Sequence, residues 1–176
     1  MEPNEIQAGL AAAVEEVLET MCFTSVLSSG EGAAPAGIGA EHRTASVSER
    51  TSPPGGKTGD AAAPSCTAAL RFTDDPSGGF RVSVPRTLAR AVGAGFLGCD
   101  ELEVSDAQAE GVVCELANMI CGSVLSRLES EATFQIAHPE LVPPERGAGS
   151  ENAGIHRWFD LGDGILTVSL ELQPTV

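Results

Sequence analysis

The sequence predicts an α+β fold, in which a mainly antiparallel sheet of five or six strands carries two long helices and one short helix. Two observations support this prediction. Apolar residues recur at three- and four-residue steps over residues 5–22 and 106–129, which is typical of amphipathic helices. Elsewhere, stretches with alternating apolar and polar residues are joined by turn sequences, which is typical of antiparallel hairpins.

The composition favours one globular domain, and we expect residues 1–176 to form it. The net charge of −15 argues against nucleic acid and anionic membranes as partners, because their phosphate groups would be repelled. No apolar run reaches the roughly 18 residues that a membrane-spanning helix needs. The N-terminus lacks the pattern of a signal peptide, and the five cysteines form no C-x-x-C pair, so we expect a cytoplasmic protein with reduced thiols.

The first half of the chain is expected to hold one helix and a long insertion. The helix covers residues 5–22, and a short strand is expected over residues 23–27. Residues 29–65 consist mainly of Gly, Ala, Pro, Ser and Thr, with Ile38 and Val47 as the large apolar residues. Such a segment buries too little surface to offset the entropy of ordering, so we interpret it as a disordered insertion.

Two hairpins are expected to supply most of the sheet. Their strands are residues 66–73 with 80–84, and residues 155–161 with 164–172 around Gly162-Asp163-Gly164. A short helix is expected after Pro85, and a further strand over residues 132–137, before Pro139. The sequence GAGFLG at residues 93–98 matches G-x-G-x-x-G, but a helix and not a strand precedes it. We therefore interpret these glycines as the end of the short helix and not as a nucleotide site.

The segment 106–129 is the long helix around which we expect the rest of the chain to be organised. Opposite its apolar stripe lie four residues spaced four, three and four apart: Gly111, Glu115, Asn118 and Gly122. A glycine inside a helix costs about 1 kcal/mol relative to alanine, so two on one face suggest that another molecule approaches closely. A solvated helix face also commonly carries an acid and an amide, and spacing alone does not separate the two interpretations.

The sequence ELANMICG at residues 115–122, in this order of elements, resembles the CheC/CheX family of chemotaxis phosphatases. The family's helix carries E-x-x-N, commonly in an ELANMI-x-G setting, and a proline follows at the end of the next strand, where this chain has Pro139. The likeness covers residues 5–28 and 66–173. Fuller forms of the motif have Asp or Ser at the position of Gly111.

The resemblance favours the CheX-like branch of the family. CheC-like members often carry a second acid–amide pair on the first helix, whereas here Glu15, Glu16 and Glu19 have no Asn three residues later. One site per chain is therefore implied. CheX-like members are homodimers, so the resemblance also implies a possible homodimer.

The resemblance implies a phosphatase that hydrolyses the aspartyl phosphate of a phosphorylated CheY-like response regulator. Asn118 would hold the attacking water, and Glu115 would pair with the regulator's active-site lysine. Gly111, Gly122 and Pro139 would face the partner. The Mg²⁺ would belong to the regulator, so no metal or other cofactor is expected in this chain.

Two alternatives remain open from the sequence. Gly111 in place of Asp or Ser favours a non-catalytic module that binds a response regulator or another signalling partner. The third possibility is a structural relative of flagellar-switch proteins.

Overall fold

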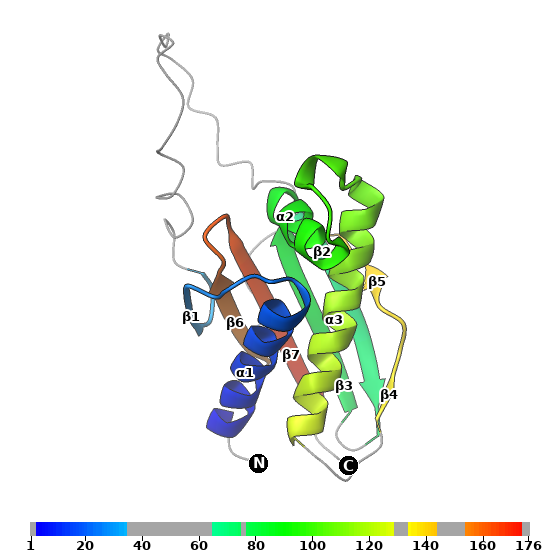
Figure 1. Cartoon of the computed structure of the whole chain (residues 1–176). Coiled ribbons are helices and arrows are strands. Elements are labelled where there is room, and N and C mark those ends of the chain that lie inside the picture. Colours follow the sequence, from blue (N-terminus) through cyan, green and yellow to red (C-terminus); the bar gives the residue numbers. More distant parts are fainter. Residues whose placement is uncertain (1–2, 35–64, 75–76, 129–133, 144–153, 174–176) are drawn as a thin grey trace, which may run out of the picture.

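The computed structural model describes residues 3–34, 65–74, 77–128, 134–143 and 154–173 (Figure 1). Within these ranges the elements are α1 (Pro3–Met21), β1 (Ser28–Glu31), β2 (Ser65–Thr73), β3 (Ser77–Pro85), α2 (Arg86–Leu97), the 3-10 turn η2 (Glu101–Glu103), α3 (Asp106–Leu128), β4 (Gln135–Ile136), β5 (Glu140–Leu141), β6 (Ile155–Asp160) and β7 (Ile165–Gln173).

The strands of the described ranges form one seven-stranded antiparallel sheet in the order β1-β6-β7-β3-β2-β4, and β5 pairs with β2 beside β4. Both expected hairpins, β2–β3 and β6–β7, are present, and β3 joins them by pairing with β7. Helices α1 and α3 lie side by side on one face of the sheet, with α2 across its end (Figure 1). The predicted α+β fold is confirmed.

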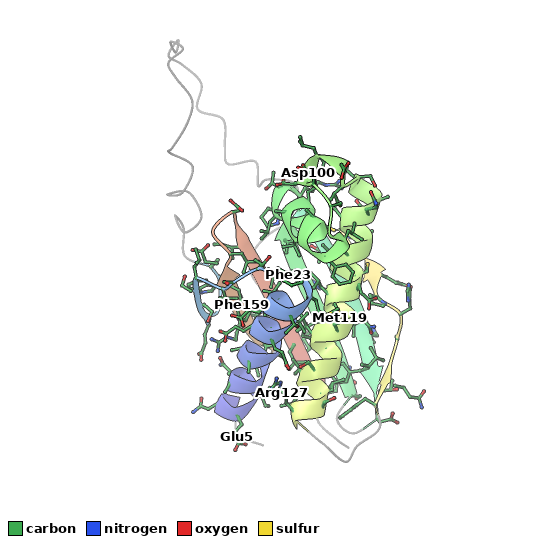
Figure 2. All side chains as sticks on the ribbon, in the orientation of Figure 1. Glu5, Phe23, Asp100, Met119, Arg127 and Phe159 are labelled. Carbon is green, nitrogen blue, oxygen red and sulfur yellow. The ribbon has the colours of Figure 1, made fainter. Side chains whose placement is uncertain are left out.

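Helix α3 contributes more buried residues to the core than any other element. Val113, Leu116 and Ile120 of α3 are fully buried, and they follow the three- and four-residue steps seen in the sequence. Strand β3 buries every second residue along its length, so one face of the sheet receives the helices. On the outside of this core, Arg127 of α3 forms an ion pair with Glu16 of α1 (Figure 2).

Local sequence explains where α3 begins. The Gln108 backbone N–H donates to Ser105 Oγ at 3.3 Å, and the Ser105 backbone N–H donates to Gln108 Oε1 at 3.0 Å. This reciprocal pair is a capping box, which satisfies backbone donors that the first turn of a helix leaves without partners.

The prediction of a strand over residues 23–27 is wrong. Phe23 has a φ of +54°, the Thr24 backbone N–H donates to the Leu18 carbonyl at 3.1 Å, and the Phe23 side chain is 83% exposed (Figure 2). The chain therefore leaves α1 through a left-handed residue, a conformation that ends helices and is incompatible with a strand. The first strand begins only at Ser28.

Two other predicted boundaries also shift. Residues 29–31 belong to β1 and Ser65 opens β2, so both ends of the predicted insertion are ordered. Residues 32–34 are also described, whereas residues 35–64 of the insertion lie outside the described residues. Residues 129–133 lie outside them as well, and with them part of the strand expected over 132–137. Of that strand, β4 retains Gln135–Ile136.

The glycines of segment 93–98 do not all end the short helix. Gly98 does so, with a φ of +67° and its backbone N–H donating to the Ala94 carbonyl at 2.9 Å. Gly93 and Gly95 lie inside α2. A Cβ added at Gly95 would lie 2.1 Å from the Cys22 carbonyl oxygen, so this glycine allows α2 to pack against the end of α1.

Candidate active site

An open groove runs between α3 and the chain segment that contains β4. We call it the site groove. It is lined by Gly111, Cys114, Glu115, Asn118, Ile136, Ala137, His138 and Pro139. Four of the five residues singled out from the sequence therefore line one groove.

Helix periodicity places Glu115 and Asn118 on this groove. Leu116 and Ala117, which lie between them in sequence, are fully buried and point into the core. Glu115 is exposed and Asn118 is half-buried, one turn further along the helix. The buried neighbours hold the helix rigidly, so the two side chains project from a fixed backbone.

Neither side chain is used by the fold. Within the part of the chain that the structure describes, Glu115 and Asn118 form no hydrogen bond or ion pair with another residue. Other polar residues of α3 do have such partners, as Asp106 has in Arg90. The carboxylate and the amide are therefore available to a molecule that enters the groove.

The opposite wall is held by strand pairing to β2. The Ala137 backbone N–H donates to the Arg71 carbonyl at 2.8 Å, and the Val142 backbone N–H donates to the Thr67 carbonyl at 2.9 Å. Pro139 lies between these two hydrogen bonds and is buried. Its fixed φ and its burial indicate that it shapes this wall, so a direct contact of its ring with a partner would be limited.

The two glycines of the α3 face have different surroundings. A Cβ added at Gly111 would meet no atom within 4 Å, and this residue lines the site groove. Gly122 does not line it; a Cβ there would lie 3.8 Å from Ile136 Cδ1, an ordinary packing distance. Gly111 thus leaves open space beside Glu115, whereas Gly122 lies against β4.

Cys114 and His138 also line the groove, and sequence reasoning missed both as site residues. For Cys114 a signal existed, because it directly precedes Glu115 on the same helix. Burial, followed by the nearby charge of Glu110, raises the pKa of its thiol, so the thiol stays protonated and weakly nucleophilic near neutral pH. His138 had only its position before Pro139 as a signal, because its approach to α3 depends on the pairing of distant strands.

Ion pairs join α2 to the first turns of α3. Arg90 Nη2 lies 2.7 Å from Asp106 Oδ1, and Arg86 Nη2 lies 3.3 Å from Glu110 Oε1. The hydrogen bond and charge of Arg90 hold the pKa of the Asp106 carboxyl below its usual range. These arginines are engaged within the fold, on the side of α3 next to Cys114.

The described residues around the groove include no set of side chains suited to bind a metal ion. Across the described ranges, no three His, Cys, Asp or Glu side chains come together in an arrangement that could hold a metal ion. The groove itself offers one carboxylate, one imidazole and one thiol that burial keeps protonated.

By length and composition alone, α3 is apolar enough to cross a membrane. Nine of its residues are buried in the core, among them Val113, Leu116 and Ile120. The core helix of a water-soluble protein has the same properties, and α3 packs on the sheet as such a helix does.

Solved structures of chemotaxis proteins share this fold. A CheX from Desulfovibrio desulfuricans has 21% sequence identity and a TM-score of 0.65, with 96% of this chain and 99% of that chain covered. A CheX from Vibrio vulnificus has 16% identity and a TM-score of 0.64, with 96% of each chain covered. A CheX from Borrelia burgdorferi, in a complex with CheY, BeF3 and Mg, has 15% identity and a TM-score of 0.62, with 96% and 97% covered.

The chain therefore has the fold of these CheX structures. A family model described as chemotaxis phosphatase CheX matches residues 66–158, more than half of the chain, and the chain belongs to this family. The suspected family is thereby confirmed. The comparison with curated proteins finds no match to this sequence.

Proposed function

We propose that this chain hydrolyses the aspartyl phosphate of a phosphorylated CheY-like receiver domain. The observation that carries the proposal is the pair Glu115 and Asn118, which line the site groove and have no partners within the described part of the chain. Membership of the CheX family and the CheX–CheY complex of Borrelia burgdorferi support it.

The reaction needs a water molecule held in line with the phosphorus atom. An acyl phosphate is already activated, so positioning supplies most of the possible acceleration. The Asn118 amide can accept a hydrogen bond from water and donate one toward a phosphoryl oxygen, and it carries no charge that would repel the phosphate. The water oxygen bonds to phosphorus, the bond to the aspartate oxygen breaks, and the aspartate leaves as a carboxylate. One proton of the water passes to the solvent, and the other stays on the released phosphate.

Glu115 is assigned a binding role. A carboxylate beside a phosphoryl group is repelled by it and is a poor choice for a general base there. Its exposed position, one helical turn before Asn118, suits an ion pair with a lysine of the partner. Such a pair would hold α3 over the phosphorylated residue. The Mg²⁺ of the reaction would be bound by the receiver domain.

The surroundings of the catalytic pair, the location of the protein and its oligomeric state are part of the same proposal. Gly111 leaves space for a partner loop, and Pro139 supports the facing wall, whereas the environment of Gly122 is more consistent with packing of β4. A cytoplasmic location follows from the proposed substrate. A homodimer is proposed from the family resemblance alone, and sedimentation of the purified chain would test it.

The direct test is phosphate release from a panel of phosphorylated receiver domains. We expect Asn118→Ala and Glu115→Ala each to slow release by about tenfold or more, the scale of loss when a positioning or binding group is removed. Both positions are accessible, so both variants should keep the thermal stability of the wild-type protein. Release rates that neither substitution changes would contradict the proposal.

A second candidate is a receiver-binding module without catalysis. Gly111 favours this candidate, because a glycine has no side chain that could contact a substrate bound beside Glu115. The space at its Cβ position is open. Binding of the phosphorylated receiver without release of phosphate would establish this candidate. Release that then appears in Gly111→Ser would show that this one position had removed the activity.

A further inference from the structure

The site groove carries a third polar side chain, His138, which the proposed reaction does not use. We propose that His138 is a further partner-binding residue, which donates a hydrogen bond to the phosphoryl group and gives the groove its preference for the phosphorylated form. This inference rests on the proposed function and adds a recognition residue to it.

The backbone around His138 is held in place. Its neighbour Ala137 donates to the Arg71 carbonyl at 2.8 Å, and the next residue, Pro139, is buried. His138 thus lies on a short link between two strands that both pair with β2. A side chain on such a link is presented at a defined place with little loss of backbone entropy on binding.

The imidazole itself is available. His138 is exposed, and within the described ranges no residue hydrogen-bonds to its ring. It lies on the wall that faces α3, so it approaches a bound molecule from the side opposite Asn118. An imidazole has an N–H donor in both protonation states, and this donor suits a phosphoryl oxygen.

Charge makes this donor important. The chain has a net charge of −15, and the site groove contains the carboxylate of Glu115, so a phosphoryl group that enters is repelled. Among the described residues that line the groove, His138 has a ring N–H donor that does not belong to an acid or a thiol, and it lies across the groove from Asn118. The nearby Arg86 and Arg90 are occupied by Glu110 and Asp106.

His138 also borders a second hollow, on the uncovered face of the sheet, together with Arg71 and Glu140. It therefore lies at the rim of the site groove and not at its floor. A residue at the rim contributes to binding of the phosphorylated partner, whereas Asn118 contributes to the reaction. The two roles separate in the kinetics, because His138 should affect KM and Asn118 should affect kcat.

The test compares His138→Ala and His138→Gln with His156→Ala. His156 is an exposed histidine on β6, near the edge of the sheet opposite to β4, and it serves as the matched control. The readouts are KM and kcat for phosphate release, and Kd for one receiver with and without beryllium fluoride. Thermal melting of each variant checks that the fold is retained.

We expect His138→Ala to raise KM and the Kd of the beryllofluoride form by about tenfold, as for loss of a hydrogen bond to a charged group. The kcat and the Kd of the untreated receiver should stay near the wild-type values. His138→Gln should recover part of the affinity, because its amide can donate, and His156→Ala should behave as the wild-type protein.

Several results would overturn the inference. If His138→Ala leaves KM unchanged while Asn118→Ala abolishes release, the inference fails and the proposed function stands. Equal weakening toward both receiver forms, or a lowered kcat with an unchanged KM, would also reject it, because neither is recognition of the phosphoryl group. If the wild-type protein neither binds nor dephosphorylates any receiver, both proposals fail.

Discussion

Three buried cysteine thiols make the stability of the folded chain sensitive to alkaline pH. Burial raises the pKa of Cys22 and of Cys66 from 9.0 to about 11, and that of Cys121 to about 12. Above pH 9 the unfolded chain loses these protons, whereas the folded chain keeps them. The free energy of unfolding is therefore highest below pH 9, and it falls as the pH rises toward 11 and 12.

Urea unfolding at half-unit steps from pH 7 to 11 measures this loss. We expect the midpoint to be level up to about pH 8.5, the ordinary range of a free thiol, and to fall above it. The chain has no tyrosine, so phenol groups do not contribute. Cys121→Ala should make the fall shallower, since it removes the thiol with the highest pKa, and an unchanged slope would contradict the explanation.

Asn118 shows how a single residue's role depends on its phase along the helix. Residues 116 and 117 point into the core, while Glu115 and Asn118 point outward. The sequence predicts this arrangement because a period of 3.6 residues is a local property. What lies opposite Glu115 and Asn118 depends on residues that are distant in the sequence. The sequence alone therefore left open whether this face of the helix only contacts water.

At the scale of elements, replacing a glycine by alanine should change the free energy of unfolding in opposite directions in α3 and α2. Gly111 in α3 has open space at its Cβ position, so Gly111→Ala should raise the free energy of unfolding by about 0.5–1 kcal/mol. At Gly95 in α2 an added Cβ would meet the backbone of Cys22, so Gly95→Ala should lower it by about 1–3 kcal/mol. Chemical denaturation of both variants measures the two changes.

Gly122→Ala is the control for this comparison, because its Cβ would make only an ordinary contact with Ile136. It should stabilise the protein about as much as Gly111→Ala does. Destabilisation by Gly111→Ala, or tolerance of Gly95→Ala, would show that the helix packing described above is wrong.

Element prediction succeeded where the pattern was long and local. The helix at Asp106–Leu128 and both hairpins follow from periodicity and turn residues. Strands β4 and β5 have two residues each, too few to show a pattern, and their position depends on pairing with β2. The pairing of this wall with β2, and with it the approach of His138 to α3, therefore could not be predicted from the sequence.

At the scale of the whole molecule, α3 takes part in both the core and the candidate site. One face of the sheet packs against α1 and α3 to form the core (Figure 1). The site groove opens between α3 and the segment that contains β4. A partner can reach this groove without disturbing the core. The fold shared with CheX structures of low identity is thus compatible with a site whose few residues decide the activity.

We propose that Asn118 accelerates hydrolysis and contributes little to binding. The most direct measurement is single-turnover phosphate release from a phosphorylated receiver, with the Kd of the same receiver, for wild-type protein and Asn118→Ala. Gln135→Ala, which alters an exposed amide of β4 outside the site groove, is the control. We expect Asn118→Ala to slow release by about tenfold or more, with Kd nearly unchanged and with the control as active as the wild-type protein. Release at the wild-type rate from Asn118→Ala, at saturating protein, would contradict it.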